Sequence, residues 1–346
     1  MLLSRKMFGS LLAFLIGCLI LTGIAELTLR VIYPQWGDFS VNRFVQTEYV
    51  PDYGVVYTGR PGFDGYFAQN NGDFRVHIRI NNAGLRNDEP VTVADKRVWL
   101  LGDSMTFGWG VEREEMYSSQ LNSMLPIQTY NVASPGTDVC GYEALTKRMP
   151  NDVKPAGVIV GLILENDILS YDCQAKPMEI GRYEDWTPSL AWLKVVLTSH
   201  SALYNFLSVS VKRVDVLREG LITIGAIKRE HAYRSLPSEE QVRKNIESTA
   251  NELQNLRNLY DLKTPFLIAV IPSRFEIING DQAFKSLRVE ILAALKVRGL
   301  PTLDLFPAFN QYPLLDTHFA HDGHWSPRGH QLAAETISTA FIKQLP

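Results

Sequence analysis

Short apolar runs alternate with amphipathic patterns from about residue 98 to the end of the chain. Helical patterns begin at a Ser238-Glu239-Glu240-Gln241 capping box, near Gln282 and at Pro327. Continuous apolar strands joined by amphipathic helices are typical of a parallel sheet covered on both faces. The pattern therefore predicts a three-layer α/β/α fold, in which ligands bind beyond the carboxyl ends of the strands. The predicted strands cover residues 98–101, 127–132, 157–164, 265–271 and 301–305.

One interval interrupts this alternation. About a hundred residues separate the third and fourth predicted strands, where a simple crossover needs far fewer. Leu190 to Leu217 is apolar with helical spacing. We interpret residues 171–236 as a helical insert, which either caps the site or extends the core.

Residues 31–95 have a different character, rich in aromatic residues, glycine and asparagine. Phe74 to Ile80 alternates like a strand, and Asn81-Asn82-Ala83-Gly84 is typical of a turn. The sequence thus predicts a small β-rich leader over 31–95, ahead of a main domain over 96–346.

The segment Met7 to Ala25 contains no charged residue and follows Arg5 and Lys6. It is long enough to nearly cross a hydrocarbon layer of about 30 Å. A buried core helix, a cleaved signal peptide and a lipoprotein modified at Cys18 are alternatives. No Ala-x-Ala site follows the run, and the residues after Cys18 stay apolar. We favour an uncleaved signal anchor within residues 1–30, a single pass that leaves the main domain periplasmic or at the cell surface.

Composition and charge exclude several classes of protein. The chain has 346 residues, 46% of them hydrophobic, and a formal charge of −3, so neither disorder nor a nucleic-acid partner is indicated. Three cysteines are too few for a disulfide-framed mini-protein, and no Cys-x-x-Cys motif exists. Cys140 and Cys173 follow the second and third strands, where they either pair or remain buried thiols.

Candidate reactive groups follow four of the predicted strands. Ser104 lies in Gly102-Asp103-Ser104 after the first strand, Gly136 follows the second, and Asn166 ends the third. The segment from His321 to Gly329 follows the last strand and contains Asp322 two residues before His324. A serine needs a base to become a nucleophile, and a histidine oriented by a carboxylate supplies one.

The order serine, glycine, asparagine, acid and histidine resembles the SGNH hydrolases, also called GDSL esterases, from Lys96 to Phe341. The resemblance implies a flavodoxin-like SGNH hydrolase fold. Ser104 would be the nucleophile, His324 the base and Asp322 the acid. The amide groups of Ser104, Gly136 and Asn166 would bind the oxyanion. Many members carry the acid three residues before the histidine, where this chain has His321. The Asp-x-His-Trp form resembles a membrane-anchored bacterial envelope subgroup similar to the alginate O-acetyltransferase branch.

The resemblance implies a serine-dependent esterase that acts on acyl esters, with acetyl as the expected acyl group, outside the cytoplasm and without a cofactor. Two alternatives remain, namely an O-acetyltransferase that modifies an envelope or secreted polysaccharide and a catalytically silent envelope binding module. The expected partners are an acyl ester, a carbohydrate if the protein is a transferase, envelope proteins, and the membrane through residues 7–25.

Four histidines lie close together in the sequence near the C-terminus, namely His318, His321, His324 and His330. Their spacing matches no zinc signature, so we expect no metal.

Overall fold

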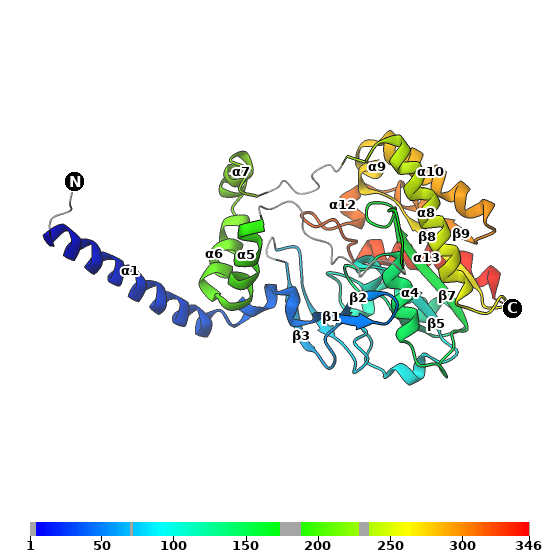
Figure 1. Ribbon diagram of the computed structural model, residues 1–346, viewed down its shortest axis with the longest axis horizontal. Helices are drawn as coiled ribbons and strands as arrows, with labels where there is room; N and C mark the ends of the chain where they lie inside the picture. Colours follow the sequence, from blue (N-terminus) through cyan, green and yellow to red (C-terminus); the bar gives the residue numbers. More distant parts are fainter. Residues whose placement is uncertain (1–4, 70–71, 174–187, 228–234, 346) are drawn as a thin grey trace. The chain divides into compact units, whose positions relative to one another are not determined.

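A five-stranded parallel sheet forms the centre of the protein. The computed structural model describes residues 5–69, 72–173, 188–227 and 235–345 (Figure 1). The strand order is β6-β5-β7-β8-β9, and every pair of neighbours is parallel. In order along the chain this is 2-1-3-4-5, the flavodoxin-like order, so the predicted fold class is confirmed. The strands are β5 (Val98–Leu101), β6 (Thr129–Asn131), β7 (Gly157–Ile163), β8 (Phe266–Ile271) and β9 (Thr302–Asp304).

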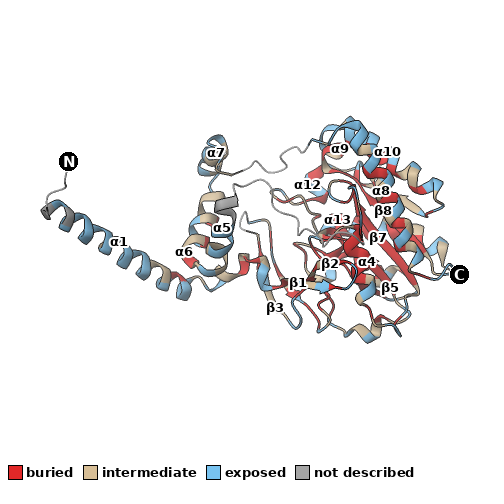
Figure 2. Ribbon diagram, in the orientation of Figure 1, coloured by how far each residue is buried: buried red, intermediate tan, exposed pale blue. Residues whose placement is uncertain are grey.

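Helices cover both faces of this sheet, because alternate residues of each strand point to opposite sides. Trp99 and Leu101 belong to one buried cluster, whereas Val98 and Leu100 belong to the other. The first cluster includes residues of α4 (Val139–Arg148), α8 (Glu239–Asn258) and α10 (Gln282–Val297). The second includes residues of α3 (Tyr117–Met124) and α13 (Pro327–Phe341). Both faces of the sheet are therefore buried, as the continuous apolar strands predict (Figure 2).

Shorter elements complete the protein. The leader contains two small two-stranded sheets, one of β1 (Val45–Val50) with β2 (Gly54–Gly59) and one of β3 (Asp64–Ala68) with β4 (Arg75–Arg79). The short helices are η1 (Pro34–Phe39), η2 (Val41–Arg43), η3 (Val91–Ala94), α2 (Ser104–Phe107), η4 (Arg113–Glu115), α9 (Arg274–Asn279), α11 (Phe306–Phe309), α12 (Leu314–Thr317) and η5 (Ile342–Gln344).

The chain divides into two compact units. The larger unit comprises Val41–Tyr66, Asp73–Tyr183 and Lys228–Pro346 and contains the central sheet. The smaller unit comprises Met1–Ser40, Phe67–Gly72 and Glu184–Ile227. It contains α1 (Arg5–Ile32) and the helices of the predicted insert, α5 (Pro188–His200), α6 (Ala202–Lys212) and α7 (Asp215–Thr223). Two other parts of the insert, 174–187 and 228–234, lie outside the described residues.

Helix α1 is long and apolar enough to cross a membrane. The stretch Gly9–Ile32 has 24 residues. Its most apolar 18-residue window has a mean hydropathy of 2.2, and none of that window is buried within the protein. At 1.5 Å per residue the stretch extends roughly 36 Å. The alternative of a buried core helix is therefore wrong, because this helix contributes no side chains from that window to a core.

Candidate active site

Ser104 lies at the carboxyl end of β5, on the first turn of α2. Gly102 joins the strand to the helix with φ of +156°, and a Cβ there would lie 2.0 Å from the Thr106 Oγ1 atom. Only glycine fits at this position. The Asp103 carboxylate accepts a hydrogen bond of 2.9 Å from the Met105 N–H and so caps the helix. This strand, loop and cap hold Ser104 at the edge where ligands of parallel sheets bind.

His324 and Asp322 lie on a short loop that precedes α13. The loop is closed at its base by a β-bridge between His318 and Trp325, and the Phe319 N–H donates to the His324 carbonyl at 3.0 Å. Within it, Asp322 Oδ1 accepts from the His324 backbone N–H at 3.0 Å and is also hydrogen-bonded to His324 Nδ1. One carboxylate oxygen therefore fixes both the backbone and the imidazole of His324.

The structure brings Ser104, His324 and Asp322 together. His324 Nε2 lies 2.8 Å from Ser104 Oγ, while Nδ1 of the same ring faces Asp322. The Asp322 side chain is 7% exposed and the His324 side chain 24% exposed. The Trp109 ring stacks on the imidazole with centroids 5.5 Å apart. A buried carboxylate, an oriented imidazole and a hydroxyl in this arrangement can activate serine as a nucleophile.

Gly323 lies between Asp322 and His324 for a reason that the spacing did not indicate. Backbone freedom is the expected role of a glycine in a tight turn, but Gly323 has no positive φ. A Cβ at Gly323 would instead lie 1.8 Å from Arg274 Nη1. A larger residue here would therefore have to displace the Arg274 guanidinium, which lies directly against this part of the backbone.

The loops that follow β6 and β7 reach the same edge of the sheet. Gly136 and Asn166 are both exposed, and Asn166 Nδ2 donates to Asp103 Oδ2 at 3.4 Å. The Ser134 N–H donates to the carbonyl of Gly102 at 3.3 Å. These contacts tie both loops to the residues that precede Ser104. The oxyanion roles of the Ser104, Gly136 and Asn166 amides remain predictions.

Two buried carboxyl groups shape the electrostatics of the site. Burial raises the pKa of Asp103, although the Met105 N–H and the charge of His324 oppose this shift. Burial also lowers the pKa of His324, but the charge and hydrogen bond of Asp322, together with Asp103, outweigh it and raise the pKa. The Arg274 charge acts in the opposite direction. His324 is thus a stronger base than a free imidazole.

A residue of the leader also contacts this loop, which sequence reasoning missed. Asp73 Oδ2 accepts from the His321 backbone N–H at 2.9 Å, and Asp73 Oδ1 lies 2.8 Å from His321 Nδ1. The Asp73 side chain is 5% exposed, and the ring of the adjacent Phe74 lies 5.1 Å from that of Phe319. His321 therefore holds the loop to the leader. No local pattern signals a contact between residues so far apart in the chain.

The four C-terminal histidines contact four different parts of the protein. Burial lowers the pKa of His330 to about 3, so this imidazole is neutral. At least one ring nitrogen of each histidine is engaged by a separate protein group, whereas the buried Nε2 of His330 has no hydrogen-bond partner. The partners are Thr317 Oγ1 for His318, Asp73 for His321, Ser104 and Asp322 for His324, and the Tyr117 N–H for His330.

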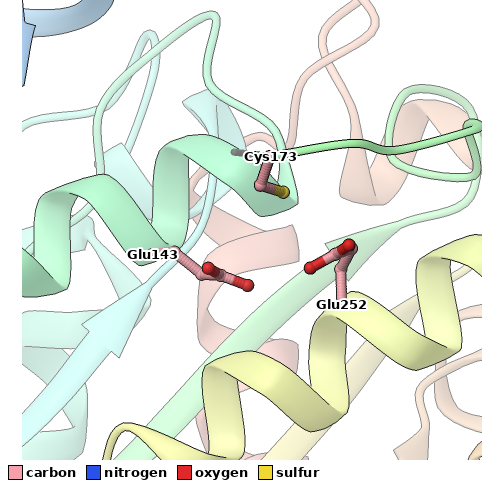
Figure 3. Close-up of side chains that lie close together, drawn as sticks. All are labelled: Glu143, Cys173 and Glu252. Carbon is pink, nitrogen blue, oxygen red and sulfur yellow. The ribbon is translucent and has the colours of Figure 1, made fainter. Parts of the chain in front are cut away.

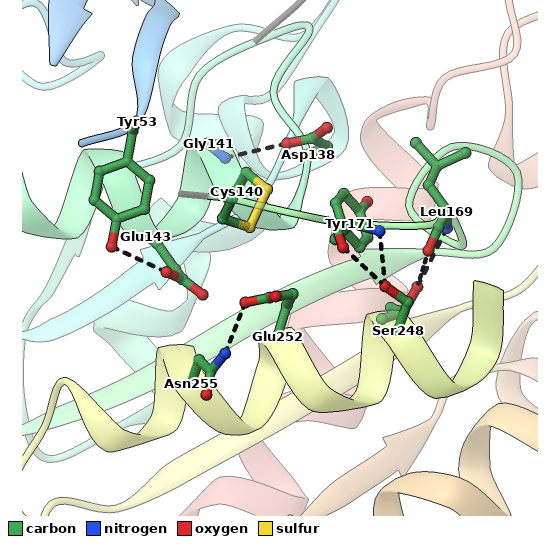
Figure 4. The surroundings of a disulfide bond; sticks show 12 residues. Tyr53, Asp138, Cys140, Gly141, Glu143, Leu169, Tyr171, Ser248, Glu252 and Asn255 are labelled. Carbon is green, nitrogen blue, oxygen red and sulfur yellow. Dashed lines mark hydrogen bonds between the residues drawn. A yellow bond between two sulfur atoms is a disulfide. The ribbon is translucent and has the colours of Figure 1, made fainter. Parts of the chain in front are cut away.

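Cys140 and Cys173 form a disulfide, which settles the alternative between a bond and two free thiols. Their Cα atoms are 5.1 Å apart and 33 positions separate them in the sequence. Cys140 lies at the start of α4, after the Gly136 loop, and Cys173 follows the Asn166 loop (Figure 4). The bond therefore joins the segments that follow two of the candidate oxyanion loops.

One carboxylate pair lies beside this disulfide. Glu143, Glu252 and Cys173 each place a possible ligand atom within 4.8 Å of the others (Figure 3). The Cys173 sulfur is not a thiolate, because it is bonded to Cys140. The Tyr53 hydroxyl donates to Glu143 Oε2 at 3.0 Å, and burial raises the pKa of Glu143 to about 7. This group is a buried acid rather than a convincing metal site.

Comparisons with known proteins give only distant structural likeness. No family model matches the chain, and no curated protein matches it. A G-D-S-L lipolytic protein from Veillonella parvula is 13% identical with a TM-score of 0.40, over 71% of this chain and 98% of its own. A lipase/acylhydrolase from Enterococcus faecalis is 15% identical with a TM-score of 0.40, over 72% and 97% of the two chains. A carbohydrate esterase family 2 enzyme from Corynascus thermopiles is 12% identical with a TM-score of 0.42, over 72% and 66%.

Proposed function

We propose that this protein is a serine-dependent esterase of the SGNH type that acts on acyl esters. The observation that carries the proposal is the contact of His324 Nε2 with Ser104 Oγ at 2.8 Å, with Asp322 on the opposite nitrogen. Acyl transfer by this mechanism requires a serine hydrogen-bonded to an imidazole, which in turn is hydrogen-bonded to a buried carboxylate.

In the proposed reaction, Ser104 Oγ attacks the ester carbonyl carbon while its proton passes to His324 Nε2. The carbonyl oxygen becomes an oxyanion, which the amides of Ser104, Gly136 and Asn166 would stabilise. The tetrahedral intermediate then collapses, and His324 returns the proton to the departing alcohol. In the second half, His324 takes a proton from water, which attacks the acyl carbon. The bond to Ser104 Oγ then breaks, His324 returns the proton to Oγ, and the acid is released.

The proposal places this reaction outside the cytoplasm, with α1 as a membrane anchor. The support is the apolar stretch Gly9–Ile32 behind the basic pair Arg5 and Lys6. The disulfide between Cys140 and Cys173 supports the same side, because such bonds persist in oxidising compartments. A reporter fused after Pro346 should be active only outside the cytoplasm, and activity only inside would contradict this topology.

An assay with two acceptors tests the reaction. The purified full chain in detergent is given a short-chain aryl ester, with and without a free oligosaccharide, and both products are quantified. Release of the acid shows esterase activity, whereas acyl groups on the oligosaccharide would identify a transferase. No turnover of the ester in either arm would favour the silent binding module and overturn the proposal.

A further inference from the structure

The three insert helices expose an unusual amount of apolar surface. Helix α5 is apolar almost all round, with Lys194 as the one charged side chain between Trp192 and Leu197. A helix of this kind is normally buried in a core or in lipid, yet Trp192 is 61% exposed. The exposed apolar residues of this part of the chain are Trp192, Leu193, Val195, Val196, Phe206, Leu207, Val214, Val216, Leu217 and Ile224. Figure 2 shows exposed positions along the described parts of these helices, interspersed with intermediate ones and, on α6, with buried ones.

The smaller unit has little core of its own to explain these residues. Within α6 only Ala202, Asn205 and Val209 are buried, and α7 has no buried residue. Single exposed apolar side chains are ordinary, but a series of this length on adjacent helices marks a surface that contacts something else.

The same helices are fastened to the end of the candidate membrane helix. Glu26 of α1 accepts hydrogen bonds of 2.9 Å from the Ser201 hydroxyl and from the backbone N–H groups of Ala202 and Leu203. Arg30 donates to the carbonyl of His200 at 2.5 Å. Both residues lie in the last two turns of α1, so the start of α6 is fixed to that end of the helix.

This junction has the composition of a membrane boundary. Glu26 is the first charged residue after the apolar run Met7 to Ala25, so in an inserted α1 it would lie where hydrocarbon gives way to headgroups. The Arg30 guanidinium lies 4.6 Å from the centroid of the Trp36 ring, and the Tyr33 ring lies 5.9 Å from that of Phe206. Tyrosine and tryptophan concentrate at this depth in membrane proteins.

From these contacts we infer that α5, α6 and α7 form a lipid-contacting platform that lies on the bilayer at the headgroup boundary. The inference rests on the proposed insertion of α1. A helix that adsorbs in this way buries its apolar side chains about 5–10 Å into the boundary. The four basic and two acidic residues between Pro188 and Thr223 also suit an anionic lipid surface. The insert would then hold the protein close to the membrane.

Site-specific fluorescence in lipid nanodiscs tests the platform with the full chain. An environment-sensitive fluorophore is attached to Leu207→Cys or Leu217→Cys in a Cys18→Ser background. Leu262→Cys and Val297→Cys are matched controls, because they are apolar, 91% and 85% exposed, and lie on the larger unit. Quenching is measured with lipids that carry a nitroxide near the headgroup, and with iodide in the water.

The platform predicts that labels at residues 207 and 217 lose most of their fluorescence to the nitroxide lipids, while the two control labels do not. A label on the native Cys18, measured with lipids that carry the nitroxide deep in the acyl chain, reports separately on α1. If Cys18 is quenched by nitroxide lipids but residues 207 and 217 behave like the controls, the platform is wrong and the anchor stands. If Cys18 is not quenched, the anchor itself fails. Labels at 207 and 217 that are shielded from both quenchers would show that protein covers these helices, as a cap or a second copy, and would also overturn the platform.

Discussion

His324 Nε2 and Ser104 Oγ lie 2.8 Å apart, although 220 positions separate the two residues in the chain. The contact joins the loop after β5 to the loop before α13, so it exists only when both ends of the main domain are folded. Variants of the site must therefore be compared at equal concentrations of folded protein, so that loss of this contact is distinguished from loss of the fold.

The Asp322→Asn variant should lose roughly 10²–10⁴-fold in turnover, because an amide favours the wrong imidazole tautomer and cannot stabilise the imidazolium. His321→Ala should cost much less, since the His321 side chain contacts Asp73 and not Ser104. Ester hydrolysis by both purified variants, at equal folded concentration, makes the comparison. A large loss of turnover in His321→Ala, together with nearly normal turnover in Asp322→Asn, would show that the acid is assigned wrongly.

Asp73→Ala should lower turnover about 10-fold while the KM for the ester changes little, because Asp73 positions the loop and does not reach the substrate. Asp64→Ala is a control for loss of an Asp–His pair elsewhere in the leader, and both variants are compared with wild type at equal folded concentration. Asp64 forms an Asp–His pair with His77 in the same leader, at 2.5 Å, but this pair lies on β3 and β4 and not on the His324 loop. Equal losses of turnover in the two variants would mean that Asp73 acts only through stability.

Arg274→Gln should move the acidic limb of the pH–rate profile to higher pH. Activity requires neutral His324, and the Arg274 charge lowers the pKa of His324. Removal of that charge raises the pKa of His324, so a higher pH is needed to deprotonate the imidazolium. Arg274→Lys keeps the charge and should leave the limb close to its original position. A limb that moves to lower pH in Arg274→Gln would contradict this electrostatic role.

Much of the fold follows from local patterns, whereas some of the site does not. The strands β5, β7 and β8 are continuous apolar runs, so their burial on both faces can be predicted without any distant contact. Ser104 and His324 follow strand ends, and the geometry of a parallel sheet then brings those ends to one edge. Asp73 could not be found in this way, because nothing near it in the sequence indicates that it meets His321. Spacing likewise left the pairing of the cysteines open, because the distance between two loops depends on packing.

Glu143→Gln should remove part of the pH dependence of stability. The pKa of Glu143 is about 7 in the folded protein and 4.5 for an ordinary glutamate, so the folded state binds the proton more tightly. Protonation of Glu143 therefore stabilises the folded state by roughly 3 kcal/mol in total. This stabilisation is fully present below the pKa of the unfolded state, and it is lost as the pH rises through the pKa of the folded state. Urea unfolding at about pH 5 and about pH 8 measures the change. Substitution of the exposed Glu290 by glutamine serves as control. If the pH dependence of stability in Glu143→Gln equals that of the wild type, the assignment of this dependence to Glu143 is wrong.

The most direct test of the account is covalent labelling of the nucleophile. The full chain is treated with a serine-reactive phosphonate, and the modified residue is located by peptide mass spectrometry, in parallel with the Ser104→Ala variant. We expect one adduct, on Ser104, and no labelling of the variant, whose thermal unfolding should remain like that of the wild type. Labelling of Ser104→Ala at the full rate, or an adduct on another residue, would contradict the proposed esterase site.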